Sequence, residues 1–325
     1  MRYALRRAGQ AAIVLIAAFT ATFFLLQMLP GDAILIKFDN PELGLSPEQI
    51  EAIRASYGAD VPWWQQYLTT LAAYAHGDFG YSTQYGTGVL EILGEALPAT
   101  AALAGLGFLV AALLATVIAF VSTLTPFTWL RNGLRALPGL FVSVPVFWLG
   151  ILLIQVFSFG LGWVPIVGAD PAQALILPVL TLAVPISAPL AQILVRSIDE
   201  VRLQPFVTVI RAKGAAPSWV LWNSVARNAI LPTLTIAGVL FGELIGGAVV
   251  TETVFGRAGV GRVTEQAVAN QDIPVLQGIV VLAALTFVVV NLVVDLLYPV
   301  LDPRLRSRSQ RVRVEAAPIP LEAAA

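Results

Sequence analysis

The sequence predicts an all-α polytopic membrane protein with six transmembrane helices. Of its 325 residues, 58% are hydrophobic and only 12% are charged, about half the charge of an ordinary soluble domain. The mean hydropathy is +0.81. Long runs without charge recur along the chain, and a helix needs about 20 apolar residues to cross the hydrocarbon of a bilayer. A soluble enzyme is therefore excluded. The net charge of −1 gives no general attraction to nucleic acid.

Six apolar runs are long enough to span. The first follows Arg2, Arg6 and Arg7. It exceeds the usual apolar stretch of a signal peptide and no small-residue cleavage site follows it, so we expect a retained anchor. The fifth run contains one acid, Glu243, and the sixth contains Asp295. In chain order, the expected spans are 8–29, 99–124, 136–159, 175–195, 229–250 and 273–297.

The distribution of basic residues predicts the orientation. Only four of the 19 Lys and Arg residues (Lys37, Arg54, Arg257 and Arg262) lie on one side of the six expected spans. The remaining 15 lie on the other side, which is the cytoplasmic side by the positive-inside rule. Both termini are therefore expected in the cytoplasm, with residues 1–29 forming the N-terminus and first span.

The external segment, residues 30–94, has the composition of a small soluble unit. Ser46-Pro47-Glu48-Gln49 is typical of a helix N-terminus with a capping box, and we expect that helix to end at Gly58. A second helix is expected over 62–75, and His76 belongs to the same external cap. The segment either covers the outer mouth or docks an external partner, and its length does not decide between these.

The cytoplasmic segment 196–228 carries several helix signals. Pro205 suits a helix start, Gly214 a helix stop and Pro217 a second start. On the second helix, Trp222 lies on the apolar half and Arg227 on the polar half. Two short helices at an angle would form an elbow that transmits movement from a soluble partner. An amphipathic helix lying on the headgroups is the alternative.

Several motifs together resemble one family, the permease subunits of bacterial ABC importers in the oligopeptide, dipeptide and nickel branch. The family's cytoplasmic "EAA" loop is similar to the stretch Thr208 to Gly214 followed by Ser224 to Asn228, although Thr208-Val209-Ile210 stands in place of E-A-A. The similarity continues along nearly the whole chain: Leu29-Pro30-Gly31-Asp32, Gly77-Asp78-Phe79-Gly80, Leu97-Pro98-Ala99-Thr100, Val144-Pro145-Val146-Phe147-Trp148-Leu149-Gly150, Thr251-Glu252-Thr253-Val254-Phe255, Gly259-Val260-Gly261 and Leu301-Asp302-Pro303-Arg304.

The resemblance implies a type I importer fold: a five-span core over 95–301 after the extra first span, with a cytoplasmic coupling helix and a basic, disordered tail over 302–325. It implies a bacterial inner-membrane subunit that works with a second homologous permease, two cytoplasmic ATP-binding subunits and an external substrate-binding protein. Residues implied to couple to the ATPase are Thr208, Arg211, Ala212, Lys213, Gly214, Pro217, Trp222, Arg227 and Asn228.

The residues themselves indicate that the chain is no ATPase. A phosphate-binding P-loop needs Gly-Lys, but the two lysines, Lys37 and Lys213, follow Ile36 and Ala212. We therefore expect no catalysis and no bound cofactor here, with ATP and Mg²⁺ on partner subunits. The resemblance implies dipeptides, oligopeptides, nickel or related small solutes as cargo. Of these, a metal path is disfavoured because cysteine is absent and His76 is the single histidine, so peptides are the favoured cargo.

Two hypotheses remain: a permease half driven by separate ATPases, or a self-contained secondary transporter or channel. The second would show inverted repeats and several ionisable groups within the spans. Glu243 either lines the path or makes a packing contact beside Gly242, Gly246 and Gly247. Pro145 and Pro185 loosen their spans and free carbonyls toward protein or a water-filled cavity, which suits a transporter or a channel equally.

Overall fold

The computed structural model describes residues 2–27, 46–49 and 61–301. The expected helix end at Gly58 and the expected disordered tail lie outside these residues. Helices dominate the described residues, and the one β-bridge among them joins Tyr81 to Gly88. The long helices are α1 (Arg2–Gln27), α5 (Val89–Leu124), α8 (Gln173–Arg202), α11 (Ala226–Val254) and α13 (Ile273–Leu301); the shorter ones are α4 (Trp63–Ala75), α6 (Thr128–Ser143), α7 (Val146–Leu153), α9 (Pro205–Ala212), α10 (Pro217–Val220) and α12 (Val260–Ala269), with π-helical turns η2 (Ile154–Gly160) and η3 (Leu221–Val225).

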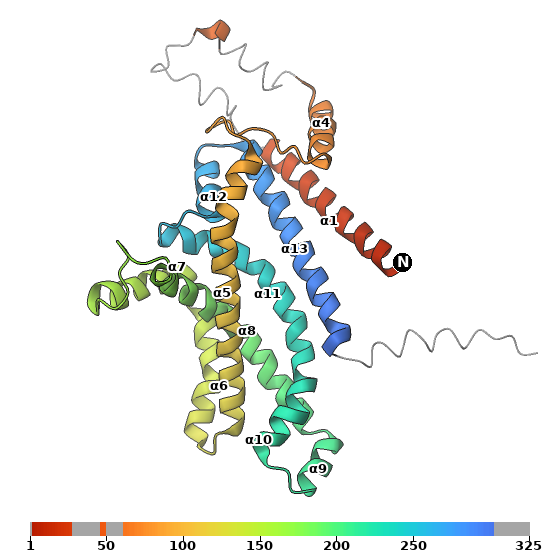
Figure 1. Ribbon diagram of the computed structural model, residues 1–325, viewed down its shortest axis with the longest axis vertical. Helices are drawn as coiled ribbons and strands as arrows, with labels where there is room; N and C mark the ends of the chain where they lie inside the picture. Colours follow the sequence, from red (N-terminus) through yellow and green to blue (C-terminus); the bar gives the residue numbers. More distant parts are fainter. Residues whose placement is uncertain (1, 28–45, 50–60, 302–325) are drawn as a thin grey trace, which may run out of the picture.

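The centre of the bundle is the packing of α5 and α11 on α8 (Figure 1). Leu182 of α8 is buried between two glycines. An added Cβ would lie 3.0 Å from Leu182 Cδ2 at Gly107 of α5 and 2.9 Å from its Cδ1 at Gly247 of α11. Small residues let helix backbones approach closely where lipid gives no hydrophobic drive between helices. These glycines therefore set the spacing of the three central helices.

Five of the six expected spans are present as single apolar helices long enough to cross a membrane. The third expected span, 136–159, is wrong as a single straight helix. In its place α6 and α7–η2 form a pair bent by 105°, which makes a sixth span only if the pair is counted as one. Pro145 is the physical reason, because the residue before a proline is driven out of the helical region. Val144 accordingly has φ −94° and ψ 120°, and α7 begins directly after Pro145.

The first span, α1, lies against α13 at the side of the bundle (Figure 1). Arg7 Nη2 lies 2.7 Å from Asp295 Oδ2, so the acid of the last span has a cationic partner on the first. Farther along α1, Phe19 and Phe23 pack against Tyr67 of α4 at ring-centroid distances of 5.7 and 5.3 Å. The first span is therefore fastened to α13 by charge and to α4 by aromatic contacts.

The external segment contains the predicted helix start at Ser46. The backbone N–H of Ser46 donates to Gln49 Oε1 at 2.8 Å, and the N–H of Gln49 donates to Ser46 Oγ at 3.3 Å, which is the reciprocal pattern of a capping box. The second expected helix is α4, and exposed His76 caps its end. In Figure 1, α4 and α12 lie at the opposite end of the molecule from α9 and α10.

Candidate functional site

The chain between α8 and α11 folds around the three helix signals expected from its sequence. Pro205 and Pro217 are the first residues of α9 and α10, where the fixed φ of proline suits a helix and its missing N–H costs nothing. Gly214 has φ +85°, the left-handed conformation that ends helices and that glycine adopts without strain. All three predictions are confirmed. We call residues 203–228 the elbow.

The second helix of the elbow differs from the expectation of a separate short helix. From Pro217, helical structure runs through η3 directly into α11. No glycine or proline occurs between Pro217 and Pro232, so the helix continues through this stretch, with a π-helical turn at η3. The elbow thus contains one separate helix, α9, and a rigid extension of α11. A force applied there acts on α11 without a joint in between.

An apolar cluster anchors the elbow to the spans. Val207 of α9, Val220 of α10 and Val225 of η3 are fully or almost fully buried. They pack with Leu221 of η3 and with residues from α5, α8 and α11, namely Ala119, Phe120, Leu194, Ile198 and Ala229. A helix lying on headgroups would have no such protein core beneath it. The packing therefore favours the elbow over the amphipathic-helix alternative.

The opposite surface of the elbow is exposed and basic. The nine residues expected to couple to an ATPase are all on the elbow, and all are exposed except Asn228, whose Nδ2 donates to the Ser224 carbonyl at 2.8 Å. Trp222 is 60% exposed, yet its ring lies 4.4 Å from that of Phe120. Arg211, Lys213 and Arg227 are exposed and provide positive charge, and Phe206 at the start of α9 is exposed as well. Such a surface can bind a partner, and it contains no arrangement for catalysis.

A mostly apolar cavity of about 510 Å³ lies directly above the elbow, between α5, α8 and α11. Trp222 and Arg227 line its elbow side, and Thr116 and Thr233 are its polar residues farther along the spans. The elbow therefore borders space between the spans as well as the outer surface.

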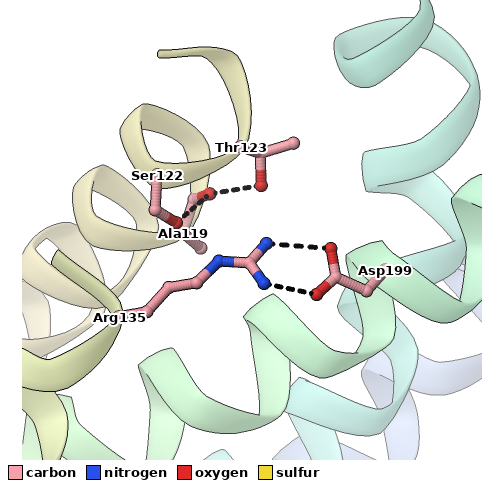
Figure 2. A network of polar contacts seen from close by, with 5 residues as sticks. All are labelled: Ala119, Ser122, Thr123, Arg135 and Asp199. Carbon is pink, nitrogen blue, oxygen red and sulfur yellow. Dashed lines mark hydrogen bonds and ion pairs between the residues drawn. The ribbon is translucent and has the colours of Figure 1, made fainter. Parts of the chain in front are cut away.

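An ion pair joins α6 to α8 next to the elbow (Figure 2). Arg135 Nη1 and Nη2 donate to the two oxygens of Asp199 at 2.9 and 3.0 Å. This two-pronged geometry fixes orientation as well as distance. On neighbouring α5, the hydroxyls of Ser122 and Thr123 both donate to the Ala119 carbonyl, so they are satisfied within their own helix. The pair holds the bent α6–α7 unit to α8.

Glu243, Pro145 and Pro185 are not brought to the elbow. Glu243 lies on α11, about 22 Å beyond Asn228 at the rise of a helix. Its side chain is exposed and has no hydrogen bond with the described residues. Pro145 begins α7, and Pro185 lies inside α8. Around Glu243, Gly242 approaches Phe287 of α13 and Gly247 approaches Leu182 of α8. The packing contacts therefore belong to the glycines, while Glu243 points away from the bundle.

The end of the molecule opposite the elbow is held by two buried carboxylates. Glu252, only 1% exposed, accepts hydrogen bonds from Thr100 Oγ1 and from the backbone N–H of Gly261, both at 2.7 Å. Thr100 Oγ1 in turn accepts from the backbone N–H of Val260 at 2.8 Å. Val260 and Gly261 are the first residues of α12, whose N–H groups and dipole favour a negative charge.

Asp272 is the second buried carboxylate and follows α12 after Asn270 and Gln271. It is 1% exposed and accepts hydrogen bonds from the Ser82 hydroxyl and from the N–H groups of Thr83 and Gln84. Preceding it, Gln271 has φ +53°, a conformation uncommon outside glycine. Asp272 thus ties the turn after α12 to the chain before α5. We call Thr100, Glu252, α12 and Asp272 together the α12 end.

Comparison with known proteins identifies the family. The sequence model described as "Binding-protein-dependent transport system inner membrane component" matches residues 107–307, and the model of its N-terminal part matches residues 1–104. The chain belongs to this family. It is a multi-pass, non-catalytic membrane subunit of a transport system, a permease, and this decides against the self-contained secondary transporter or channel.

Curated relatives of the permease extend over nearly its whole length. A protein of Brucella abortus (strain 2308) named as a peptide transport system permease is 37% identical over 93% of this chain and 98% of its own. The glutathione transport system permease protein GsiC of Escherichia coli (strain K12) is 33% identical over 94% and 99%. Both therefore match this chain as whole proteins.

Solved structures show the same fold. The permease resembles a chain of the MetNI methionine ABC transporter in an inward-facing conformation with a TM-score of 0.56 and 16% identity, covering 66% of this chain and 97% of that one. An amino acid ABC transporter solved with histidines matches with a TM-score of 0.51 and 18% identity, covering 63% and 92%. The ABC importer transmembrane fold is thus confirmed for the body of the permease.

Sequence reasoning assigned no role to the residues of the α12 end. A signal was present for Glu252, an acid at the end of an apolar run with Gly259 and Gly261 shortly after it. An added Cβ at Gly259 would collide with the Glu252 carboxylate, and one at Gly261 would collide with the Val249 backbone. No comparable signal pointed to Thr100, because its contact with Glu252 spans 152 positions. Among the described residues, no group of three or more His, Asp or Glu could hold a metal ion.

Proposed function

We propose that the permease forms one half of the translocation path of an importer for peptides. An external substrate-binding protein delivers the peptide, and a second homologous permease completes the path. Two cytoplasmic ATP-binding subunits, which carry ATP and Mg²⁺, supply the work by docking on the elbow. The relatives named as peptide and glutathione transport permeases support a peptide cargo.

The main support for coupling to ATP hydrolysis is the arrangement of the elbow. Its buried face packs on α5, α8 and α11, so a displacement of the elbow moves three long helices together. Its exposed face offers Arg211, Lys213 and Arg227, which suits a partner surface with negative charge or helix C-termini. The unbroken path from Pro217 into α11 supports direct transmission to the span that contains Glu243. Glu243, Pro145 and Pro185 are proposed to line or shape the path.

The proposed organisation is the one expected from the sequence, and the two family matches, which meet near residue 105, support an N-terminal part followed by a core. Residues 1–29 form the first span, 30–94 an external segment that contacts the binding protein, 95–301 the core and 302–325 a cytoplasmic tail. The excess of basic residues on the elbow side supports cytoplasmic termini. A single cysteine at exposed Ser218, in a chain without cysteine, should resist an impermeant maleimide in intact cells. Labelling of this cysteine would show that the elbow faces outside, which is the opposite of the proposed topology.

The test of this function is solute uptake into proteoliposomes, assembled one component at a time. The permease alone should move no peptide with ATP or with an ion gradient. Uptake should begin only with the second permease, the ATP-binding subunits and the binding protein. Gradient-driven uptake by this chain alone would contradict the proposal.

Gly214→Trp tests the elbow within the complete system. An indole at this exposed position should block the contact with the ATPase, so peptide uptake falls at least tenfold while the protein stays folded. Two controls separate bulk from backbone strain. Gly214→Asn tolerates the left-handed conformation without the bulk, and Gly168→Trp places the same bulk at another glycine of positive φ (+72°) with nothing within 4 Å of an added Cβ. If Gly214→Trp took up peptide at the wild-type rate, the elbow would not be the site that couples the permease to the ATP-binding subunits.

A further inference from the structure

A cavity of about 380 Å³ lies where α1, α4 and α13 meet, at the opposite end of the molecule from the elbow. Phe23 and Leu26 of α1, Tyr74 of α4 and Gln277 of α13 line it, together with Asp78 from the turn after α4. Its volume is in the range of sites that bind small molecules or headgroups. No role in the proposed function uses it.

A glycine turn places Asp78 at this cavity. Gly77 has φ +83°; its N–H donates to the Tyr74 carbonyl and that of Asp78 donates to the Ala73 carbonyl, both at 3.0 Å. These two bonds form a Schellman motif. Asp78 Oδ1 accepts from the N–H of Gly80 at 2.9 Å, while Oδ2 accepts no hydrogen bond from the described residues. Among the described residues, Asp78 is the only charged side chain that lines the cavity.

Two buried donors at the cavity have no acceptor. Gln277 is 5% exposed, and neither its Nε2 nor the Tyr74 hydroxyl has a hydrogen-bond partner among the described residues. Burial, and to a lesser extent nearby Asp78, raises the pKa of Tyr74, so this hydroxyl keeps its proton and remains a donor. Unsatisfied buried donors are rare in native proteins and call for an occupant. The occupant must bring an acceptor oxygen to Gln277 and Tyr74.

The charge at the cavity limits the kinds of ligand that could bind there. Asp78 favours a cation, and within the ranges that the structure describes no Lys or Arg lines the cavity to bind a bare anion. A molecule with both an ammonium and an anionic oxygen satisfies all three groups. An amphiphile fits better than a soluble one, because Leu25, next to Leu26 on α1, is 67% exposed and Trp63 of α4 is 59% exposed. Exposed tryptophans beside an apolar helix face are typical of the headgroup level of a membrane.

We propose that this cavity binds the headgroup of phosphatidylethanolamine. The phosphate accepts hydrogen bonds from Gln277 Nε2 and the Tyr74 hydroxyl, and the primary ammonium pairs with Asp78. The acyl chains lie along the exposed face of α1 at Leu25. The lipid then links α1 and α4 to α13, the helix that connects the first span to the rest of the bundle.

The test is lipid binding to the purified full-length chain by native mass spectrometry, with phosphatidylethanolamine and phosphatidylglycerol of identical acyl chains. Wild type should prefer phosphatidylethanolamine. Asp78→Asn should weaken its binding about tenfold, the size expected for losing a hydrogen bond to a charged group. Glu91→Gln removes one charge at an exposed site of α5 away from the cavity and should leave the preference unchanged. Equal binding of the two lipids by wild type would overturn the proposal.

Gln277→Leu provides a second, independent readout. Without lipid the variant should have a higher Tm than wild type, because a buried donor without partner is replaced by an apolar group of similar shape. Added phosphatidylethanolamine should raise the Tm of wild type more than that of the variant, because the variant has lost one of the two donors to the phosphate. A lipid-induced rise of equal size in both would overturn the headgroup assignment. Displacement of the lipid by alanyl-alanine, a soluble zwitterion, would assign the cavity to peptide instead.

Discussion

The two ends of the permease are built by different physical means. At the α12 end, buried carboxylates accept hydrogen bonds from hydroxyls and backbone N–H groups, and glycines allow backbone contact. At the elbow, the buried groups are three valines and a leucine, while the charged groups remain on the surface. Hydrogen bonds to a buried charge fix geometry and tolerate little displacement. Apolar packing keeps its energy when helices move together as a body.

This contrast predicts which end is rigid and which end is prepared for a partner. The charges of the α12 end are already satisfied within the chain, so its shape does not depend on a partner. The charges of the elbow have few contacts within the chain and are available to another protein. Substitutions at the α12 end should therefore lower stability most, and substitutions at the elbow should change coupling at a smaller cost in stability.

Gly261→Ala should give the largest effect, more than about 3 kcal/mol of unfolding free energy. The added methyl collides with the Val249 backbone, so α12 has to separate from α11. Unfolding of the purified chain in an SDS titration measures the change. Gly246→Ala is the matched control, since nothing lies within 4 Å of its added methyl, and within a helix it should stabilise by up to about 1 kcal/mol. Similar values for both would mean that α12 moves freely away from α11.

Glu252→Gln should cost about 2–3 kcal/mol, because an amide supplies one acceptor where the carboxylate supplies two. The same SDS titration measures it. Since Thr100 belongs to the same network, adding Thr100→Val should cost less than the sum of the two single changes. Strict additivity would show that the two side chains act separately.

Val225→Ala tests the elbow and should cost about 1.5–2 kcal/mol for the removed methyl groups and the space they leave. Because the cluster links the elbow to α5 and α8, peptide uptake per ATP hydrolysed should also fall. Val209→Ala on α9, where the side chain is 55% exposed, is the control and should change stability by less than about 0.5 kcal/mol. If Val225→Ala kept the wild-type peptide uptake per ATP hydrolysed, the apolar cluster would have no part in transmitting movement from the elbow to the spans.

Breaking the pair between Arg135 and Asp199 should give the smallest effect, below about 1 kcal/mol of coupling energy in a double-mutant cycle with alanine. The two side chains are 34% and 41% exposed, so water and salt screen them. The coupling should decrease further in 1 M salt. A coupling above about 2 kcal/mol, unchanged by salt, would place the pair in a buried environment within the assembled transporter.

Local signals in the sequence predicted local structure well. The helix starts at Pro205 and Pro217, the stop at Gly214 and the capping box at Ser46 depend on groups within a few residues of each other, and all are present. Hydropathy found five spans correctly. It missed the 105° bend at Pro145, because an average over a window records apolar character and not a change of direction.

Contacts between distant residues could not be predicted in the same way. Asp272 and Ser82 are 190 positions apart, and their pairing depends on how α12 lies against α5. The sequence therefore did not show that Glu252 and Asp272 would be buried at the two ends of α12, because their burial depends on that packing. The residues expected to couple to an ATPase were assigned from a family resemblance. Their exposure on the elbow is explained by the packing of Val207 and Val225 beneath them.

The pair between Arg7 and Asp295 has a consequence for biosynthesis. These residues join the first span to the last, so roughly 290 residues, or about 15–60 s of translation, separate the synthesis of the two partners. Until then, α1 has been synthesised but α13, the helix against which it packs, has not. When α13 enters the membrane, an arginine is already in place to receive its aspartate. The contact between the first span and the last can therefore form only after nearly the whole permease has been synthesised.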